Sequence, residues 1–375
     1  MALPSAALRR IPKQLRTVRQ QPSVEHVGGG DMTQEAESSR AQAAADQSFM
    51  KRKHEEARLR GKEPDRIGKW NRMMSGTDDA KQVFASQISP RKLRRRVFKG
   101  IPDRWRVAAW EALIARRAEA TSAKKREDHL FISSLSAPST HDVQIDLDVP
   151  RTISGHILFH TRYGLGQRNL FRVLHAFSLL CDDCAYCQGM GPIAATLLCY
   201  MVPETAFRSM AGLHDAYSLH KIFTPGFPGL VELFFLQKAL MTAFVPRLLF
   251  KLEDQMINTS SYATKWYITL FNGIVPFQTQ LRIWDAFLLE GPDVLVITSL
   301  AILWSLQDTL LDPQQGSFEH TLGTLSSYMI PESDDVLLHW IDSTLSKRST
   351  RATLIAARAE WHSLEASGKT AGLAL

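Results

Sequence analysis

The sequence has 375 residues, of which 45% are hydrophobic, so it can bury a large core in one large domain or two smaller ones. Its 45 lysines and arginines exceed its 38 acidic residues, and the net charge of +7 allows contact with an acidic partner or anionic lipid. The basic residues form no stripe interleaved with aromatic residues, which argues against a nucleic-acid-binding protein. The longest apolar runs, residues 191–203 and 294–306, are shorter than the roughly 20 residues that a membrane helix needs.

Residues 1–65 are rich in Gln, Ser, Ala, Glu and Arg and contain almost no aromatic residue. Such a segment buries too little apolar surface to offset its ordering entropy, so we predict a disordered basic and polar tail. The first two dozen residues, with no acid before Glu25, also resemble a transit peptide, although a disordered tail is the preferred interpretation. Order is expected to begin at residue 66, where Ile67 and Trp70 bring back large apolar side chains.

Residues 91–96 form the densest positive run of the chain. Alone, this run is typical of a nuclear signal or a phosphate-binding patch, and a helical nucleic-acid-binding protein that used it would bind with steep salt dependence. We favour one solvated helix face. Gly100-Ile101-Pro102 follows, and Pro102 suits the first turn of a helix. Arg106 and Trp110 are four residues apart and share a face of that helix, with the Trp as a core anchor.

From residue 154 onward, apolar segments of helical periodicity alternate with short breaks at Pro and Gly, and period-2 alternation never persists. The chain is therefore predicted to be all-α. Near its middle, Trp284, Phe287 and Leu288 have the spacing of a buried stripe on one helix. Arg282 and Asp285 are three residues apart, and we expect them to pair along that helix.

Three of the four cysteines are spaced by three residues, at Cys181, Cys184 and Cys187. This spacing resembles part of an iron–sulfur run, but the fourth ligand is misplaced, and three thiols on one face of a helix are the favoured interpretation. His156 and His160 imitate a zincin helix but lack its catalytic Glu, so they are predicted to lie on an ordinary helix. No metal site is expected; a metalloenzyme built on these residues is an alternative that requires bound metal. So few cysteines, with no hydrophobic signal sequence, indicate a reducing compartment.

Two polar motifs flank the apolar residues 170–180. The first ends in Asp148-Val149-Pro150-Arg151-Thr152, and the second reads Tyr186-Cys187-Gln188-Gly189. Neither Arg nor Gln titrates near neutral pH or acts as a useful nucleophile. Arg does offer a permanent charge and N–H donors to phosphate oxygens, and Gln can hold a water molecule. These abilities suit phosphoryl transfer, which depends on positioning and on neutralising charge.

The spacing Ile145-x-x-Asp148-x-x-Arg151-Thr152, followed by Tyr186-x-Gln188-Gly189-Met190, resembles the TBC domain of Rab GTPase-activating proteins. Gly100-Ile101-Pro102 with Arg106 and Trp110 is similar to the opening motif of that domain, and residues 282–291, with Arg282, Trp284 and Asp285, to a later one. The resemblance implies two lobes of helices with a groove that receives a Rab protein. It places the domain at residues 66–350, with core motifs at 94–312, before a C-terminal helix end and frayed tail at 351–375.

The resemblance also implies roles for the polar motifs. Arg151 would act as an arginine finger that enters the nucleotide site of a GTP-loaded Rab-family GTPase, and Gln188 as a glutamine finger that orients the attacking water. Asp148 would hold the Arg151 guanidinium by a charge-assisted pair. The chain would then be a GTPase activator and not a free-standing enzyme, without a cofactor of its own, because GTP and Mg²⁺ belong to the partner.

Around these two residues the resemblance assigns support. Tyr186 would pack behind the Gln and fix its approach, Thr152 completes the first motif, and Gly189 lets two backbones come close because it has no Cβ. One departure is Ala185, where the family commonly has Gly. Ala costs little there unless the position needs a positive φ.

A TBC-fold protein that binds Rab without accelerating hydrolysis, as a scaffold or effector, is the alternative. Loss of Arg151 or Gln188 would favour it, and both are present. The expected setting is cytoplasmic regulation of vesicle trafficking. Contact with an endomembrane or the plasma membrane through the basic N-terminal segment is the accompanying expectation, and no nucleic-acid partner is expected.

Overall fold

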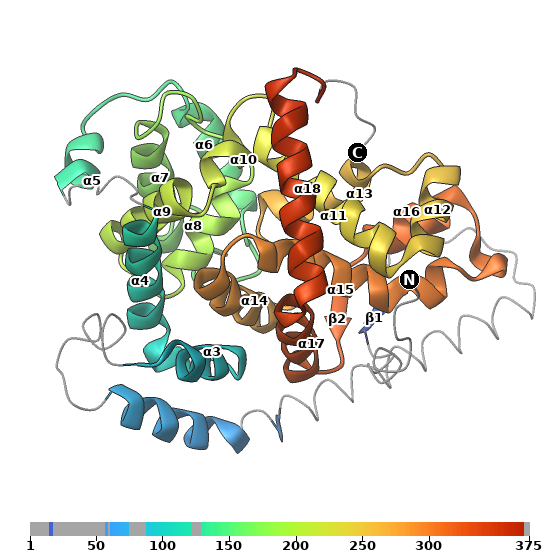
Figure 1. Cartoon of the computed structure of the whole chain (residues 1–375). Helices are drawn as coiled ribbons and strands as arrows, with labels where there is room; N and C mark the ends of the chain where they lie inside the picture. Colours follow the sequence, from blue (N-terminus) through green and yellow to red (C-terminus); the bar gives the residue numbers. More distant parts are fainter. Residues whose placement is uncertain (1–14, 18–56, 59–60, 75–87, 122–128, 371–375) are drawn as a thin grey trace, which may run out of the picture.

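The computed structural model describes residues 15–17, 57–58, 61–74, 88–121 and 129–370. Helices form nearly all of the regular structure in these ranges (Figure 1), which confirms the all-α prediction. The strands described are β1 (Leu15–Thr17) and β2 (Met329–Pro331), which pair antiparallel with Leu15 opposite Pro331.

The first group of helices, on the left of Figure 1, surrounds α7 and α9. The α7 helix contacts α5, α6, α8 and α9, and α9 also packs against α4 and α10. Apolar residues at helical spacing, such as Leu170, Val173 and Leu174 on α7, are fully buried between these helices. The elements are α4 (Asp103–Ala120), α5 (His129–Ser134), α6 (Asp142–Asp148), η1 (Val149–Arg151), α7 (Leu165–Ser178), α8 (Met190–Leu198), α9 (Pro203–Ala216) and α10 (Leu219–Phe223).

The second group is built around α11 and α15, on the right of Figure 1. Helix α15 is long and apolar enough to cross a membrane by length and composition, but 67% of its residues are buried inside the protein, so it serves as a core helix here. The elements are α11 (Pro228–Phe244), α12 (Pro246–Asp254), α13 (Thr259–Ile268), α15 (Asp293–Leu310), η2 (Pro313–Gln315), α16 (Phe318–Leu325), α17 (Asp334–Ser346) and α18 (Arg348–Ala366).

Helix α14 (Phe277–Glu290) joins the two groups, because it contacts α3 (Pro90–Phe98), α4, α15 and α17. At its centre the fully buried carboxylate of Asp285 accepts hydrogen bonds from Trp110 Nε1 at 2.8 Å and Arg106 Nε at 3.3 Å. Trp110 is also fully buried, as predicted for a core anchor. The opening motif is therefore fastened to the later one by a buried ion pair.

The predicted pairing of Arg282 with Asp285 is wrong. Arg282 donates instead to the Phe98 carbonyl oxygen at 3.0 Å and to Asp335 at 3.2 Å, while Asp285 takes the opening motif as its partner. The reason is tertiary packing, since each side chain finds its partners on other helices: Arg282 on α3 and α17, and Asp285 on α4. Gly100 makes this arrangement possible: its φ is +105°, and a Cβ there would lie 3.1 Å from Arg282 Nε.

The basic run at residues 91–96 lies on α3 and is not a fully solvated face. Leu93 of the run is buried, and Arg94 pairs with Asp342 on α17 and with Glu290 on α14. The run also lines a pocket together with residues 62–70 and 335–342. Part of its charge is thus used to hold helices together.

The predicted domain boundaries differ from the structure at both ends. Most of the predicted tail, residues 1–65, lies outside the described residues, but residues 15–17 form β1 and residues 61–74 are helical. At the other end, the boundary at residue 350 falls inside α18, a continuous helix whose Leu354 and Trp361 are buried. Because α18 packs along α11, it belongs to the folded body.

Candidate functional site

Arg151 is the last residue of a tight turn that follows α6 directly. Ile145 and Val149 are buried and anchor this segment to the core. Pro150 lies within the 3-10 turn, where its fixed φ and missing N–H are tolerated. The Arg151 side chain is 58% exposed. The Arg151 guanidinium is thus accessible to solvent, while buried neighbours fix the backbone that carries it.

Asp148 connects the two polar motifs. Its side chain, 4% exposed, forms an ion pair with Arg151 and accepts hydrogen bonds from Gln144 Nε2 at 3.0 Å and from the Tyr186 hydroxyl at 2.7 Å. A buried carboxylate is stable only when such donors compensate its desolvation. The predicted pairing of Asp148 with Arg151 is confirmed, and the contact with Tyr186 ties the second motif to the first.

Tyr186 makes its polar contact with Asp148 on the first motif, whereas the sequence predicted packing behind Gln188. Burial, and then the hydrogen bond and the negative charge of Asp148, raise the pKa of Tyr186 well above its ordinary value. The phenol therefore stays protonated and donates a hydrogen bond to the carboxylate. Gln188, two residues further on, is exposed. Arg151 and Gln188 are therefore both accessible to solvent, and the buried carboxylate of Asp148 joins the two segments that carry them.

Two residues of the α7–α8 loop have positive φ. Ala185 has a φ of +44°, so the position does need the left-handed region that the Gly of the family occupies readily. Gly189 has a φ of +135°, and a Cβ there would lie 2.9 Å from Ile268 Cγ1. The same Cβ would lie 3.3 Å from the Ile268 carbonyl oxygen, so the close approach of two backbones predicted at Gly189 is confirmed.

Thr152 holds the two motifs at close range. Its hydroxyl donates to the Asp148 carbonyl oxygen at 2.8 Å, which closes the turn that ends in Arg151. On the other side, a Cβ on Gly191 would lie 3.0 Å from Thr152 Oγ1, so the start of α8 packs against this side chain. The first motif therefore touches the helix that follows Gln188.

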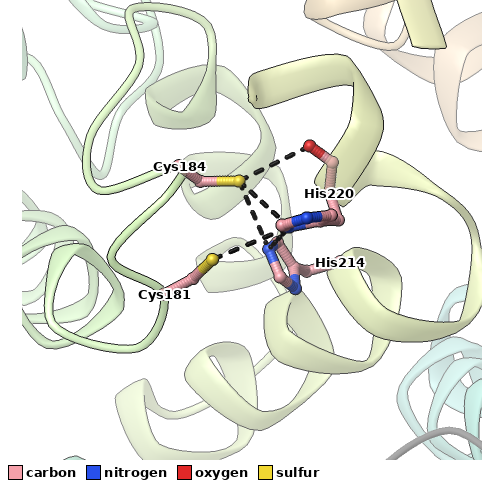
Figure 2. A group of neighbouring side chains, drawn as sticks. All are labelled: Cys181, Cys184, His214 and His220. Carbon is pink, nitrogen blue, oxygen red and sulfur yellow. Dashed lines mark hydrogen bonds between the residues drawn. The ribbon is translucent and has the colours of Figure 1, made fainter. Parts of the chain in front are cut away.

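The predicted helical positions of the cysteines and histidines are wrong. Cys181, Cys184 and Cys187 lie in the loop between α7 and α8, and His156 and His160 lie in turns ahead of α7. Cys181 and Cys184 instead meet two histidines of α9 and α10 that belong to no motif described above, His214 and His220 (Figure 2). The sequence signal for them is a C-x₂-C pair followed by H-x₅-H.

A family model described as the Rab-GTPase-TBC domain matches residues 103–311, more than half of the chain. A TBC domain-containing protein of Schizosaccharomyces pombe is 40% identical over 292 residues, which cover 76% of this chain and 68% of that protein. The Rab GTPase-activating protein tbc-11 of Caenorhabditis elegans is 34% identical over 62% of this chain, but the match spans only 24% of that longer protein.

Solved structures show the same fold. The Chlamydomonas flagellar RabGAP TBC domain superposes with a TM-score of 0.59 at 21% identity, covering 78% of this chain and 94% of that domain. The Ypt/Rab-GAP domain of Gyp1p also gives a TM-score of 0.59, at 18% identity, with 80% and 99% covered.

Proposed function

Because the chain belongs to the Rab-GTPase-TBC domain family, we propose that it accelerates GTP hydrolysis by a Rab-family GTPase, with Arg151 and Gln188 acting in trans. The observation that carries this proposal is the Asp148 bridge. It joins an exposed Arg to the loop of an exposed Gln through Tyr186.

The chemistry follows from what these side chains can do. The Arg151 guanidinium would neutralise charge that develops on the phosphate oxygens of the bound GTP, and its pairing with Asp148 limits the conformational entropy lost on docking. Gln188 would accept from and donate to the attacking water, which fixes the direction of attack. The GTP, the Mg²⁺ and the bond that breaks all belong to the GTPase.

An arginine supplied in trans accelerates GTPases by about 10³–10⁵, or roughly 4–7 kcal/mol of barrier. Lys cannot replace it, because a single ammonium lacks the planar fork that contacts two oxygens at once. Regulation of vesicle trafficking from the cytoplasm, with a GTP-loaded Rab seated in a groove between the helix groups, is part of the same proposal. So is membrane contact through the basic N-terminal segment.

Single-turnover GTP hydrolysis by a panel of Rab proteins tests the proposal. The wild type should accelerate at least one Rab, Arg151→Lys should lose about 10³-fold or more of that effect, and Gln188→Ala should also lose most of it. Arg247→Lys is the matched control, since Arg247 is exposed on α12, across Figure 1 from α6, and should keep full activity.

Two outcomes would contradict the mechanism. If Arg151→Lys keeps the wild-type acceleration, the guanidinium is not the finger. If no Rab is accelerated but one still binds in its GTP-loaded form, the chain is a scaffold or effector of the same fold.

A further inference from the structure

Four potential metal ligands converge at the α7–α8 loop, which also carries Gln188. Cys181 and Cys184 come from the α7–α8 loop, His214 from the end of α9 and His220 from α10 (Figure 2). One ligand atom from each residue lies within 4.8 Å of all the others. Cys184 and His214 are buried, with exposures of 5% and 4%, and Cys181 and His220 are half-buried.

Four of the six distances between the ligand atoms are close to the edges of a tetrahedral coordination shell. Zn–S bonds of about 2.3 Å and Zn–N bonds of about 2.0 Å give tetrahedron edges of about 3.3 Å between nitrogens and about 3.5 Å between sulfur and nitrogen. Here His220 Nδ1 lies 3.1 Å from His214 Nε2, 3.3 Å from Cys184 Sγ and 3.6 Å from Cys181 Sγ. Cys184 Sγ lies 3.5 Å from His214 Nε2.

Hydrogen bonding alone does not account for this convergence. The Nδ1 atom of a neutral imidazole carries either one proton or one lone pair, so it can satisfy only one of the three neighbours of His220 Nδ1. Two nitrogens and two sulfurs brought together in a largely buried space are satisfied at once by a cation at their centre.

A carboxylate orients one of the ligands. Asp215 Oδ1 lies 2.6 Å from His214 Nδ1, so in the neutral tautomer Nδ1–H donates to the carboxylate and the Nε2 lone pair faces the cluster. Metal-bound histidines almost always make such a contact through their other nitrogen. The spacing along the chain, C-x₂-C with H-x₅-H, also lies within the ranges of structural zinc sites.

We propose that Cys181, Cys184, His214 and His220 bind a structural zinc ion. Two thiolates and two imidazoles in a tetrahedron select zinc, and four protein ligands leave no open position for catalysis. On binding, both thiols release their protons to solvent, and the two thiolates balance the charge of the ion. This proposal departs from the sequence expectation of no metal.

The ion would cross-link the loop that carries Tyr186 and Gln188 to α9 and α10. The loop needs such support because Ala185, directly after Cys184, has a positive φ. The Ala185 N–H also donates to the Cys181 carbonyl oxygen at 2.8 Å, so this residue is hydrogen-bonded to one of the ligand residues. The role in holding Gln188 rests on the proposed function, whereas metal binding itself does not.

Zinc content of the purified full-length chain tests the site without any GTPase. After dialysis against zinc and then against zinc-free buffer, the wild type should retain one zinc per chain. Cys184→Ser and His220→Ala should retain at least tenfold less. Cys199→Ser is the matched control, since this half-buried thiol lies outside the cluster, and it should retain zinc like the wild type. Equal zinc in all variants, or none in the wild type, would overturn the proposal.

A spectroscopic measurement on the wild type tests the same site without depending on whether the variants fold. Cobalt(II) in place of zinc should give the d–d bands of a tetrahedral site and thiolate charge-transfer bands. An octahedral spectrum without thiolate bands would overturn the proposal. If zinc binds as expected while no Rab is accelerated, the metal site stands and the proposed function fails. If a chain that holds no zinc accelerates a Rab, the proposed function stands and the metal site fails.

Discussion

Ala185 shows at the scale of one residue how the site loop departs from an unstrained backbone. Its φ of +44° places an L-residue in the left-handed region, which costs about 1–2 kcal/mol. Gly at this position would avoid that cost, but the greater entropy of Gly in the unfolded chain would offset about 0.5–1 kcal/mol of the stabilisation. Ala185→Gly is therefore expected to raise the free energy of unfolding by about 0.5–1 kcal/mol. Urea unfolding at constant m-value measures this change.

The control for this substitution is Ala356→Gly. Ala356 is exposed in the interior of α18, where Gly costs about 1 kcal/mol relative to Ala. The two changes should thus have opposite signs. A loss of stability in both would show that residue 185 does not need the left-handed region in solution.

The sequence predicts the site best where contacts are local. Asp148 and Arg151 are three residues apart on one turn, and their ion pair is present as predicted. The Tyr186 bond to the same carboxylate joins residues 38 apart, and the cluster of Cys181 with His214 depends on how three elements pack. Such contacts leave no periodic signal, so only the fold reveals them.

At the scale of elements, α4 and α14 are held together by a buried ion pair. Burial, the largest single effect, would lower the pKa of Arg106, but the charge of Asp285 together with the smaller effects of Tyr200, Asp103 and the hydrogen bond to Asp285 raises the pKa above its ordinary value, so the guanidinium stays charged. Asp285→Asn removes the buried countercharge of the Arg106 guanidinium and leaves only Asp103, whose side chain is mostly exposed, as its carboxylate partner. We expect the free energy of unfolding to fall by about 3–5 kcal/mol, as measured by chemical denaturation.

Asp254→Asn provides the comparison, because Asp254 is exposed at the end of α12 and its charge is solvated. It should change stability by less than about 0.5 kcal/mol. A similar small effect of Asp285→Asn would mean that packing around Trp110, and not the charge pair, holds these helices together.

Helices were predictable where hydrophobic periodicity was strong, as in α7 and α14. The prediction failed where the backbone adopts unusual angles. The turns around His156 and His160 begin and end near Ile153 and Tyr163, whose φ values are +47° and +56°. β-branched and aromatic residues rarely adopt a positive φ, so their presence indicated continued helix instead of a turn.

At the scale of the whole molecule, Asp335 joins three parts of the chain. Its carboxylate accepts from Arg282 of α14 at 3.2 Å, from Arg66 at 3.1 Å and from Lys62 at 3.5 Å, and it lies in the first turn of α17. The helical residues 61–74, partly assigned to the predicted tail, are thereby fastened to the body. Burial would raise the pKa of Asp335, but the charges of Arg282 and Arg66 outweigh it and hold the pKa below the ordinary value of 3.8.

This shift predicts acid sensitivity. A carboxylate with a lowered pKa in the folded state contributes stability that is fully present above the ordinary Asp value and is lost as the pH falls through the folded value. The free energy of unfolding of the wild type should therefore fall more steeply below about pH 4 than that of Asp335→Asn, which should already be less stable at pH 7.

Denaturant unfolding at a series of pH values between neutral and strongly acidic would show this difference. In Asp254→Asn the free energy of unfolding should depend on pH as it does in the wild type, because the Asp254 carboxylate is exposed. If Asp335→Asn also shows the pH dependence of the wild type, the attachment of residues 61–74 to α14 and α17 does not depend on the charge of Asp335. Their packing through Trp70, which is 1% exposed, must then hold the N-terminal helix in place.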